Sequence, residues 1–300
     1  MHVSVNGKKI TFLMIIILIS FILTSCATTP KKLTIGMIPV KDANEMEKEF
    51  EPIRLYLEEQ LGIPIEVDAA DSYVSLIEGM KNETIDIGWY GAFSYVAAES
   101  EMELTPLVVQ QRKDTGIYYN SLIITQKDSG ISSIEELKGK KFAFVDSGST
   151  SGFVLPYALF KSRNITYETF FSETQYAGSH DQVLANIHSK DVDAGAISSV
   201  QYGNLLEKGI VKPEDMTIVW KSEDIPGSPY VARSKLDKKI QKRFSKAMLE
   251  IHIEETEALN SFDHTIDKYI EVDNKYYNSI RNIANILGKE YMYEYFLKGE

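Results

Sequence analysis

The chain has 300 residues, of which 44% are hydrophobic and 25% charged, a composition typical of a packed globular protein and not of a disordered one. The formal net charge of -11 argues against nucleic acid as a partner, because binding to a phosphate backbone needs a broad basic surface. The single cysteine excludes a disulfide within the chain and any cysteine-rich metal site.

The first 25 residues are predicted to be a lipoprotein signal peptide. Two lysines precede an apolar run from Phe12 to Leu23, which is long enough for a signal-peptide core and too short to span a bilayer as a helix. The small residues before Cys26 resemble the bacterial lipobox, in which the cysteine is lipidated and becomes the mature N-terminus. We therefore expect Cys26 to anchor the protein to a membrane outside the cytoplasm, with residues 26–32 as a short tether. An uncleaved anchor helix is the alternative.

Strands and helices alternate along the first part of the mature chain. Apolar extended segments are predicted at 33–40, 65–69, 85–90 and 104–110, and helices at 45–61, 73–81 and 91–99. Alternation at this short spacing favours a parallel sheet covered by helices.

The second part repeats this alternation between two long extended segments, 118–126 and 216–220. The elements predicted between them are a capping-box helix at 133–139, strands at 141–145 and 194–198, and helices at 151–163, 181–189 and 201–208. Residues 236–300 are predicted to be helical.

This organisation predicts an α/β fold of the type II periplasmic-binding-protein class. One lobe is expected to comprise residues 33–120 plus 221–300, and the other residues 121–220. Each lobe would hold a mostly parallel sheet with covering helices, and two extended hinge crossings would join them. We expect a monomer that needs neither a metal nor an organic cofactor.

A run of hydroxyl side chains is the most informative local feature. Ser149, Thr150 and Ser151 follow an apolar strand and open a helix, where O–H groups and unpaired backbone N–H groups favour an anion. Simple helix capping is the alternative explanation. A hydrolase nucleophile elbow is a poor fit, because threonine stands between Gly148 and Gly152 where that motif has serine.

Three further candidates for the site lie just before or at the start of a predicted helix. Tyr90 ends the segment Trp89-Tyr90-Gly91 and could offer its phenol to a ligand, while core packing is the alternative. Tyr73 and His180 stand at predicted helix starts, where either could reach an anion. The dispersed histidines and carboxylates show no spacing typical of metal ligands.

Several motifs together resemble the phosphate, phosphite and phosphonate-binding proteins of ABC importers. The motifs are Asp71-Ser72-Tyr73, Asp86-Ile87-Gly88-Trp89-Tyr90-Gly91, Ser149-Thr150-Ser151-Gly152-Phe153, Ala177-Gly178-Ser179-His180 and Val219-Trp220-Lys221-Ser222. The resemblance extends from Leu33 to about Arg233. It implies that the phosphonate oxygens are held by Tyr73, Tyr90, Ser149, Thr150, Ser151 and His180.

Two departures from that family bear on the ligand. The members that bind aminoalkyl phosphonates carry acidic residues against the ammonium group, and the corresponding positions here are Val200 and Ser228. An ammonium group buried against these neutral side chains would lose its charged partner. We therefore expect phosphite, methylphosphonate or phosphate as the ligand.

The resemblance implies a non-enzymatic lipoprotein that captures the anion by hinge closure and delivers it to an ABC permease. Two other hypotheses stay open at this point. One is a receptor that reports to a sensor kinase, and the other is a surface-anchored phosphoester hydrolase.

Overall fold

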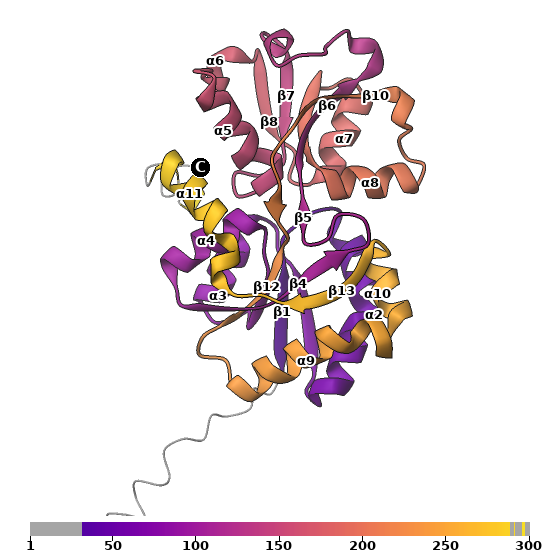
Figure 1. Ribbon diagram of the computed structural model, residues 1–300, viewed down its shortest axis with the longest axis vertical. Helices are drawn as coiled ribbons and strands as arrows, with labels where there is room; N and C mark the ends of the chain where they lie inside the picture. Colours follow the sequence, from indigo (N-terminus) through magenta and orange to yellow (C-terminus); the bar gives the residue numbers. More distant parts are fainter. Residues whose placement is uncertain (1–31, 289–290, 292–295, 298–300) are drawn as a thin grey trace, which may run out of the picture. The chain divides into compact units, whose positions relative to one another are not determined.

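The computed structural model describes residues 32–288, 291 and 296–297. The predicted signal peptide and Cys26 lie outside the described residues. Two β-sheets, each with its own helices, make up the described part of the chain (Figure 1).

The six-stranded sheet forms the centre of what we call the first lobe. Its strand order is β13-β4-β12-β3-β1-β2. The strands are β1 (Leu33–Met37), β2 (Ile65–Ala69), β3 (Ile87–Trp89), β4 (Leu104–Arg112), β12 (Pro229–Arg233) and β13 (Ile266–Glu271). The helices packed with them are α2 (Ala43–Leu61), α3 (Tyr73–Lys81), α4 (Ala92–Glu101), α9 (Lys238–Glu254), α10 (Thr256–Asp263) and α11 (Asn278–Leu287).

The five-stranded sheet forms the centre of the second lobe, with strand order β10-β6-β9-β7-β8. Its strands are β6 (Ser121–Gln126), β7 (Lys141–Phe144), β8 (Glu173–Tyr176), β9 (Ala194–Ser198) and β10 (Met216–Lys221). Its helices are α5 (Leu155–Ser162), α6 (Tyr167–Phe170), α7 (His180–His188) and α8 (Ser199–Glu207).

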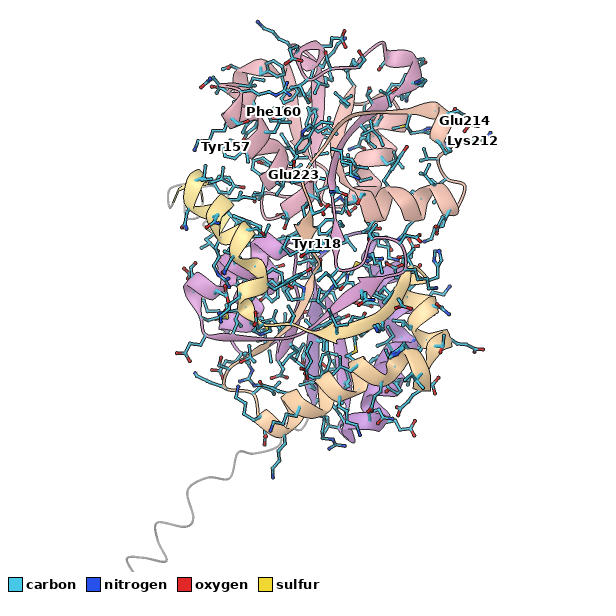
Figure 2. The ribbon with its side chains drawn as sticks, viewed as in Figure 1. Tyr118, Tyr157, Phe160, Lys212, Glu214 and Glu223 are labelled. Atoms are coloured by element: carbon cyan, nitrogen blue, oxygen red, sulfur yellow. The ribbon has the colours of Figure 1, made fainter. Side chains whose placement is uncertain are left out.

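The chain passes between the lobes at a short antiparallel ribbon. β5 (Tyr118–Tyr119) pairs with β11 (Ile225–Pro226) through the partners Tyr119 and Ile225. Figure 2 shows Tyr118 and Glu223 in this region between the two sheets. Both crossings are therefore extended segments held side by side. The return crossing differs from the predicted one, because the segment predicted at 216–220 is the edge strand β10 of the second sheet and the chain returns at Ile225–Pro226.

Parallel strands bring several helix starts to one edge of each sheet. β1 pairs in parallel with β2 and β3, and β7 pairs in parallel with β8 and β9. The carboxyl ends of parallel strands meet at the same edge, so the turns that follow them gather side chains that are distant in sequence. These turns lead into α3, α4, α7 and α8.

Two predictions, on the type of sheet and on the C-terminal segment, are wrong. Both sheets are mixed, and not mostly parallel, because β12 and β13 in the first lobe and β6 and β10 in the second pair antiparallel. The C-terminal segment is not wholly helical, because β13 lies at the edge of the first sheet. A register shift between Ile266 and Lys268 breaks the alternation of buried and exposed residues that would have indicated this strand.

The predicted capping-box helix at 133–139 is only a 3₁₀ turn, Glu135–Leu137. The Glu136 carboxylate does accept a hydrogen bond from the backbone N–H of Ser133, at 3.1 Å. One half of the capping box is therefore formed, although the turn ends before an α-helix can develop.

No helix among the described residues combines the length and apolar character needed to cross a membrane. Within the same part of the chain, no three His, Cys, Asp or Glu side chains converge as a metal site would require.

Candidate functional site

A cavity of about 60 Å³ lies between the two lobes, beside the hinge ribbon. Five of the six side chains that the sequence predicts as ligand contacts line it: Tyr73, Ser149, Thr150, Ser151 and His180. Val200 and Ser228 also line it, so the two neutral positions noted in the sequence belong to the same cavity. A space of this size suits an anion of four or five non-hydrogen atoms, since one water needs roughly 10–15 Å³ of such volume.

The hydroxyl run lies in a wide helical turn and not in an ordinary α-helix. Residues Thr150–Val154 form a π-helical turn that leads into α5, so the predicted helix at 151–163 begins with a different geometry. The Ser149 Oγ accepts a hydrogen bond from the backbone N–H of Gly152 at 3.0 Å. A widened turn of this kind leaves backbone N–H groups and hydroxyls near one another at the helix start, which favours an anion.

Thr150 joins the two lobes through its hydroxyl. Its Oγ1 accepts a hydrogen bond from the backbone N–H of Phe93, in the first turn of α4, at 2.8 Å. Thr150 is almost fully buried, with 1% of its surface exposed. Because the oxygen is already engaged by a donor, the hydroxyl proton is left to be donated elsewhere, and the side chain lines the cavity.

Tyr73 contributes from the first lobe, at the start of α3. Burial raises the pKa of its phenol, and a hydrogen bond with the Ser149 side chain opposes the rise. Its backbone N–H also lies 3.4 Å from Asp146 of the second lobe. Burial raises the pKa of Asp146, whereas hydrogen bonds from the N–H groups of Gly148 and Tyr73 oppose the rise. The phenol therefore stays protonated and available as a donor.

His180 is held in one tautomer by the second lobe. The backbone N–H of Ser198 donates to its Nδ1 at 3.1 Å, so the proton of the neutral ring is on Nε2. Burial lowers the pKa of His180 to about 3. The imidazole is thus neutral near pH 7 and can offer a single N–H to an anion.

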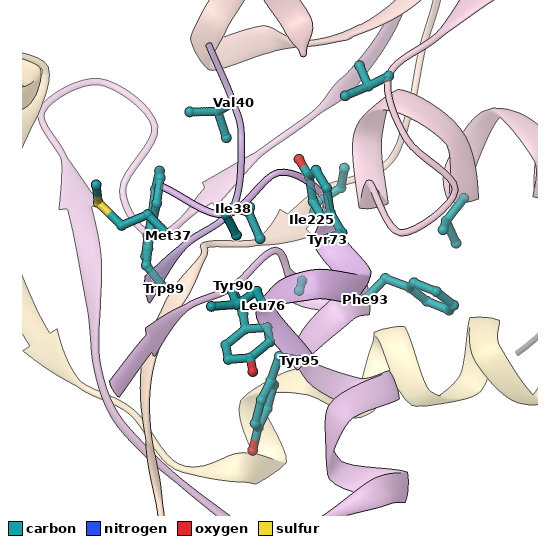
Figure 3. Packing of buried hydrophobic residues seen from close by; sticks show 14 of the residues in the cluster. Met37, Ile38, Val40, Tyr73, Leu76, Trp89, Tyr90, Phe93, Tyr95 and Ile225 are labelled. Atoms are coloured by element: carbon teal, nitrogen blue, oxygen red, sulfur yellow. The ribbon is translucent and has the colours of Figure 1, made fainter. Parts of the chain in front are cut away.

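Tyr90 does not line the cavity, and the structure corrects this part of the prediction. Its ring is buried in the first lobe, against Gly88, where an added Cβ would lie 2.4 Å from Tyr90 Cε2. Figure 3 shows its hydroxyl directed toward Tyr95, away from the hydroxyl of Tyr73. Among the described residues this buried hydroxyl has no hydrogen-bond partner. Core packing is therefore the role of Tyr90.

Tyr119 takes the place in the cavity that the sequence assigns to Tyr90. It lies in the hinge strand β5 and lines the cavity together with Ser151 and Thr150. Burial raises the pKa of its phenol to about 12, and the nearby hydroxyls of Ser151 and Thr150 act in the opposite direction. The sequence offers only a weak signal for this residue, since Tyr118 and Tyr119 stand together, both line the cavity, and only the pairing of the ribbon leaves Tyr119 the more buried of the two.

Comparison with known proteins identifies the family. The sequence profile described as "ABC transporter, phosphonate, periplasmic substrate-binding protein" matches residues 35–277. The chain belongs to this family. It is therefore the substrate-binding component of an ABC importer, an extracytoplasmic protein and not an enzyme, and it works with a membrane permease.

Relatives resemble this binding protein over most of their length. It is 28% identical to the "Phosphate-import protein PhnD" of Mycolicibacterium smegmatis, covering 89% of each chain. It is 24% identical to the "Probable ABC transporter phosphite binding protein PhnD1" of Prochlorococcus marinus, covering 87% of this chain and 92% of that one. The crystal structure of the latter with methylphosphonate has a TM-score of 0.77 over 87% of this chain and 99% of that one, at 23% identity, and so shares its fold.

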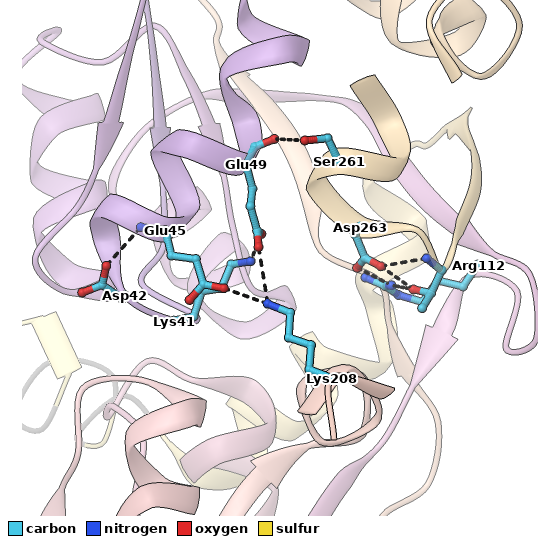
Figure 4. Close-up of polar contacts among 9 residues, drawn as sticks. Lys41, Asp42, Glu45, Glu49, Arg112, Lys208, Ser261 and Asp263 are labelled. Carbon is cyan, nitrogen blue, oxygen red and sulfur yellow. Dashed lines mark hydrogen bonds and ion pairs between the residues drawn. The ribbon is translucent and has the colours of Figure 1, made fainter. Parts of the chain in front are cut away.

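Charged residues join the lobes of this binding protein at the rim of the cleft. Lys208, after α8, pairs with Glu45 at 2.7 Å and with Glu49 at 3.4 Å, both on α2 (Figure 4). Lys41 also pairs with Glu49. Because Lys208 and Glu45 are partly exposed, such pairs stabilise contact between the lobes only modestly, by up to about 1 kcal/mol.

Proposed function

We propose that this protein captures a small phosphorus oxyanion without an amino group, namely phosphite, methylphosphonate or phosphate. The observation that carries the proposal is the convergence of neutral donors on one small cavity. Thr150 supports it most directly, because its oxygen accepts a cross-lobe hydrogen bond and its proton is left for an anion.

The proposed contacts come from both lobes. Tyr73 and Tyr119 would donate phenol protons, and His180 would donate its Nε2–H. Ser149, Thr150 and Ser151 would contribute hydroxyls, and Thr150 and Ser151 would add backbone N–H groups from the π-helical turn, whereas the N–H of Ser149 already donates to the Asp146 carbonyl. Hydrogen bonds to a charged acceptor contribute about 1.5–3 kcal/mol each, so this set can support micromolar or tighter binding after the cost of closure.

The neutral side chains of Val200 and Ser228 support the exclusion of an amine. Both line the cavity, and neither can compensate an ammonium group removed from water. The relatives named for phosphate import and phosphite binding, and the one crystallised with methylphosphonate, are consistent with an amine-free ligand.

Calorimetric titration tests the ligand directly. The panel comprises phosphite, methylphosphonate, phosphate, 2-aminoethylphosphonate and sulfate, each added to the purified mature protein. We expect saturable binding of at least one of the first three and weaker binding of the aminoalkyl compound. Tighter binding of 2-aminoethylphosphonate than of all three would refute the proposal.

The hinge crossings suggest which parts of the chain move. We propose residues 33–120 plus 221–300 and residues 121–220 as the two bodies that close over the ligand, with the β5–β11 ribbon between them. Small-angle X-ray scattering with and without ligand should show a smaller radius of gyration in the bound protein. An unchanged radius at saturating ligand would contradict hinge closure.

The sequence supports a lipid anchor on Cys26, which we propose as the means of membrane attachment. Expression of the full chain with a labelled fatty acid should label the protein, and Cys26→Ser should abolish the label. Equal labelling of both proteins would refute the assignment.

A further inference from the structure

Arg112 places a guanidinium group in the wall of the cavity. It is the last residue of β4, and its Nη1 donates to Asp263 Oδ2 at 2.6 Å and also contacts the Thr265 hydroxyl (Figure 4). Arg112 and Asp263 both line the cavity, and their side chains are 11% and 9% exposed. The ion pair therefore belongs to the cavity and not to the outer surface.

Two donor positions of this guanidinium are unused. Among the described residues, Nε and Nη2 of Arg112 have no hydrogen-bond partner, and neither is sealed from solvent. Nε–H and Nη2–H form the side edge of the guanidinium, two parallel donors that match a phosphoryl or carboxylate group. Asp263 does not accept from them; its oxygens accept from Arg112 Nη1 and from the N–H and hydroxyl of Thr265.

Another buried ion pair in the same lobe shows the contrast. Arg233 directs both Nε and Nη2 at Asp86 Oδ1, at 3.0 and 2.6 Å, and its third nitrogen lies near Glu83. Its donors are thus engaged by carboxylates of the protein. Arg112 differs because its Nε and Nη2 have no partner among the described residues, in a side chain that lines a cavity.

The charge of Arg112 reaches the hydroxyl groups that we propose as ligand contacts. Arg112 acts on the phenol of Tyr119 and favours its ionised form, although burial dominates and raises the pKa of Tyr119. Tyr119 lines the cavity together with Thr150 and Ser151. A negative charge bound at these groups therefore lies within the field of the guanidinium.

We infer that Arg112 is a specificity-determining residue that favours the doubly ionised form of the phosphorus oxyanion over the singly ionised form. A second negative charge on the ligand gains from a nearby guanidinium with free donors, whereas the neutral hydroxyls alone discriminate less between the two forms. This inference rests on the proposed function, because it concerns the same ligand and cavity.

The buried protein groups around Arg112 keep their charge near neutral pH. Burial acts to raise the pKa of Asp263, but Arg112 and Thr265 lower it by more. The pKa therefore lies below its usual value and the carboxylate stays ionised. Tyr119 has a pKa of about 12, and burial also raises the pKa of Tyr269. His180, with a pKa of about 3, stays neutral. The Lys41 ammonium, also in the cavity lining, pairs with Glu49. Between roughly pH 6 and 8.5, the loss of the ligand's own second proton is therefore the main change of charge in the cavity.

The test measures the dissociation constant of methylphosphonate between about pH 6 and pH 8.5, across the ligand's second ionisation. We expect affinity to rise with pH in the unmodified protein. In R112Q/D263N, which removes both charges and leaves no unpaired carboxylate, the rise should shrink by about tenfold or more, as one charge-assisted hydrogen bond implies. R112K, which keeps the charge without the fork, should retain part of the rise.

Two controls separate this effect from changes in the fold. R233Q/D86N removes the matched ion pair outside the cavity and should leave the pH profile unchanged, whatever it does to stability. H264Q is made both in the unmodified protein and in each double variant. It removes the exposed imidazole of the residue next to Asp263, and this imidazole pairs with Glu207. An unmodified pH profile in folded R112Q/D263N, or the same loss in R233Q/D86N, overturns the inference. Failure of the unmodified protein to bind any phosphorus oxyanion would instead refute the proposed function.

Discussion

Two tyrosines provide the sharpest test of how the cavity is built. Tyr119→Phe removes a phenol that lines the cavity, whereas Tyr90→Phe removes one that is buried in the core of the first lobe. A hydrogen bond to a charged ligand contributes about 1.5–3 kcal/mol, so Y119F should weaken ligand binding by about 10- to 150-fold. Y90F should leave binding unchanged, because its hydroxyl does not reach the cavity.

The same pair makes opposite predictions for stability. The Tyr90 hydroxyl has no partner among the described residues, and an unpaired buried hydroxyl costs about 1–3 kcal/mol. Y90F should therefore unfold at an equal or higher temperature than the unmodified protein. Y119F leaves the neighbouring Thr150 and Ser151 hydroxyls without the phenol oxygen and should be slightly destabilised, by about 1 kcal/mol.

Calorimetry with methylphosphonate and thermal unfolding without ligand measure both effects on the same samples. The reasoning fails if Y90F weakens binding as much as Y119F does, since that would place the Tyr90 phenol on the ligand. It also fails if Y119F binds as tightly as the unmodified protein while remaining folded.

Three further predictions concern acid sensitivity, close packing and closure. His180 is buried in its neutral form, with a pKa of about 3. Its contribution to stability is present above its unfolded pKa, about 6.5, and is lost as pH falls toward 3. The melting temperature of H180Q should therefore fall less steeply than that of the unmodified protein between these two pH values. Gly148→Ala would place a Cβ 2.1 Å from Phe296 Cε2 and 2.8 Å from Tyr73 Cβ, at the first residue of α3. We therefore expect a more open protein by X-ray scattering and weaker ligand binding by calorimetry. An unchanged affinity would contradict this packing. Lys208→Gln removes the ion pair with Glu45 and should weaken ligand binding by up to about fivefold at low salt. The effect should be smaller in roughly 0.5 M salt, where the Debye length is only a few ångströms. Equal effects at both salt concentrations would argue against an electrostatic origin.

Hydrophobic periodicity was enough to predict most elements because their packing follows a regular repeat. The helix predicted at 45–61 is α2, which buries Met46, Phe50, Ile53, Leu57 and Leu61. The strand predicted at 194–198 coincides with β9, whose residues are all buried. β13 escaped prediction because its bulge separates Ile266 from Tyr269 by an irregular step, and β12 because only its position between β3 and β4 makes it a strand. Pairing partners distant in sequence decide such elements.

Some residues of the candidate site could be predicted from local sequence signals, and others depend on contacts between residues distant in the sequence. The hydroxyl run and the helix-start residues Tyr73 and His180 could be predicted, because a strand followed by a helix start has local sequence signals. The choice between Tyr90 and Tyr119 could not, since it depends on the register of the hinge ribbon and on the packing against Gly88. Arg112 could not be predicted either, because its partner Asp263 is 151 residues away.

The cavity shows how a protein with a net charge of -11 can present a site for an anion. Most of the proposed donors are neutral, and their orientation depends on contact between the lobes: Thr150 is fixed by the N–H of Phe93, and Tyr73 lies against Asp146. These cross-lobe bonds involve the same residues as the proposed ligand contacts, so we expect closure and binding to stabilise each other. The overall negative charge acts mainly on long-range steering, which salt screens, whereas the buried donors act at contact distance, where screening is weak. Affinity should therefore follow the geometry of closure more closely than the net charge of the chain.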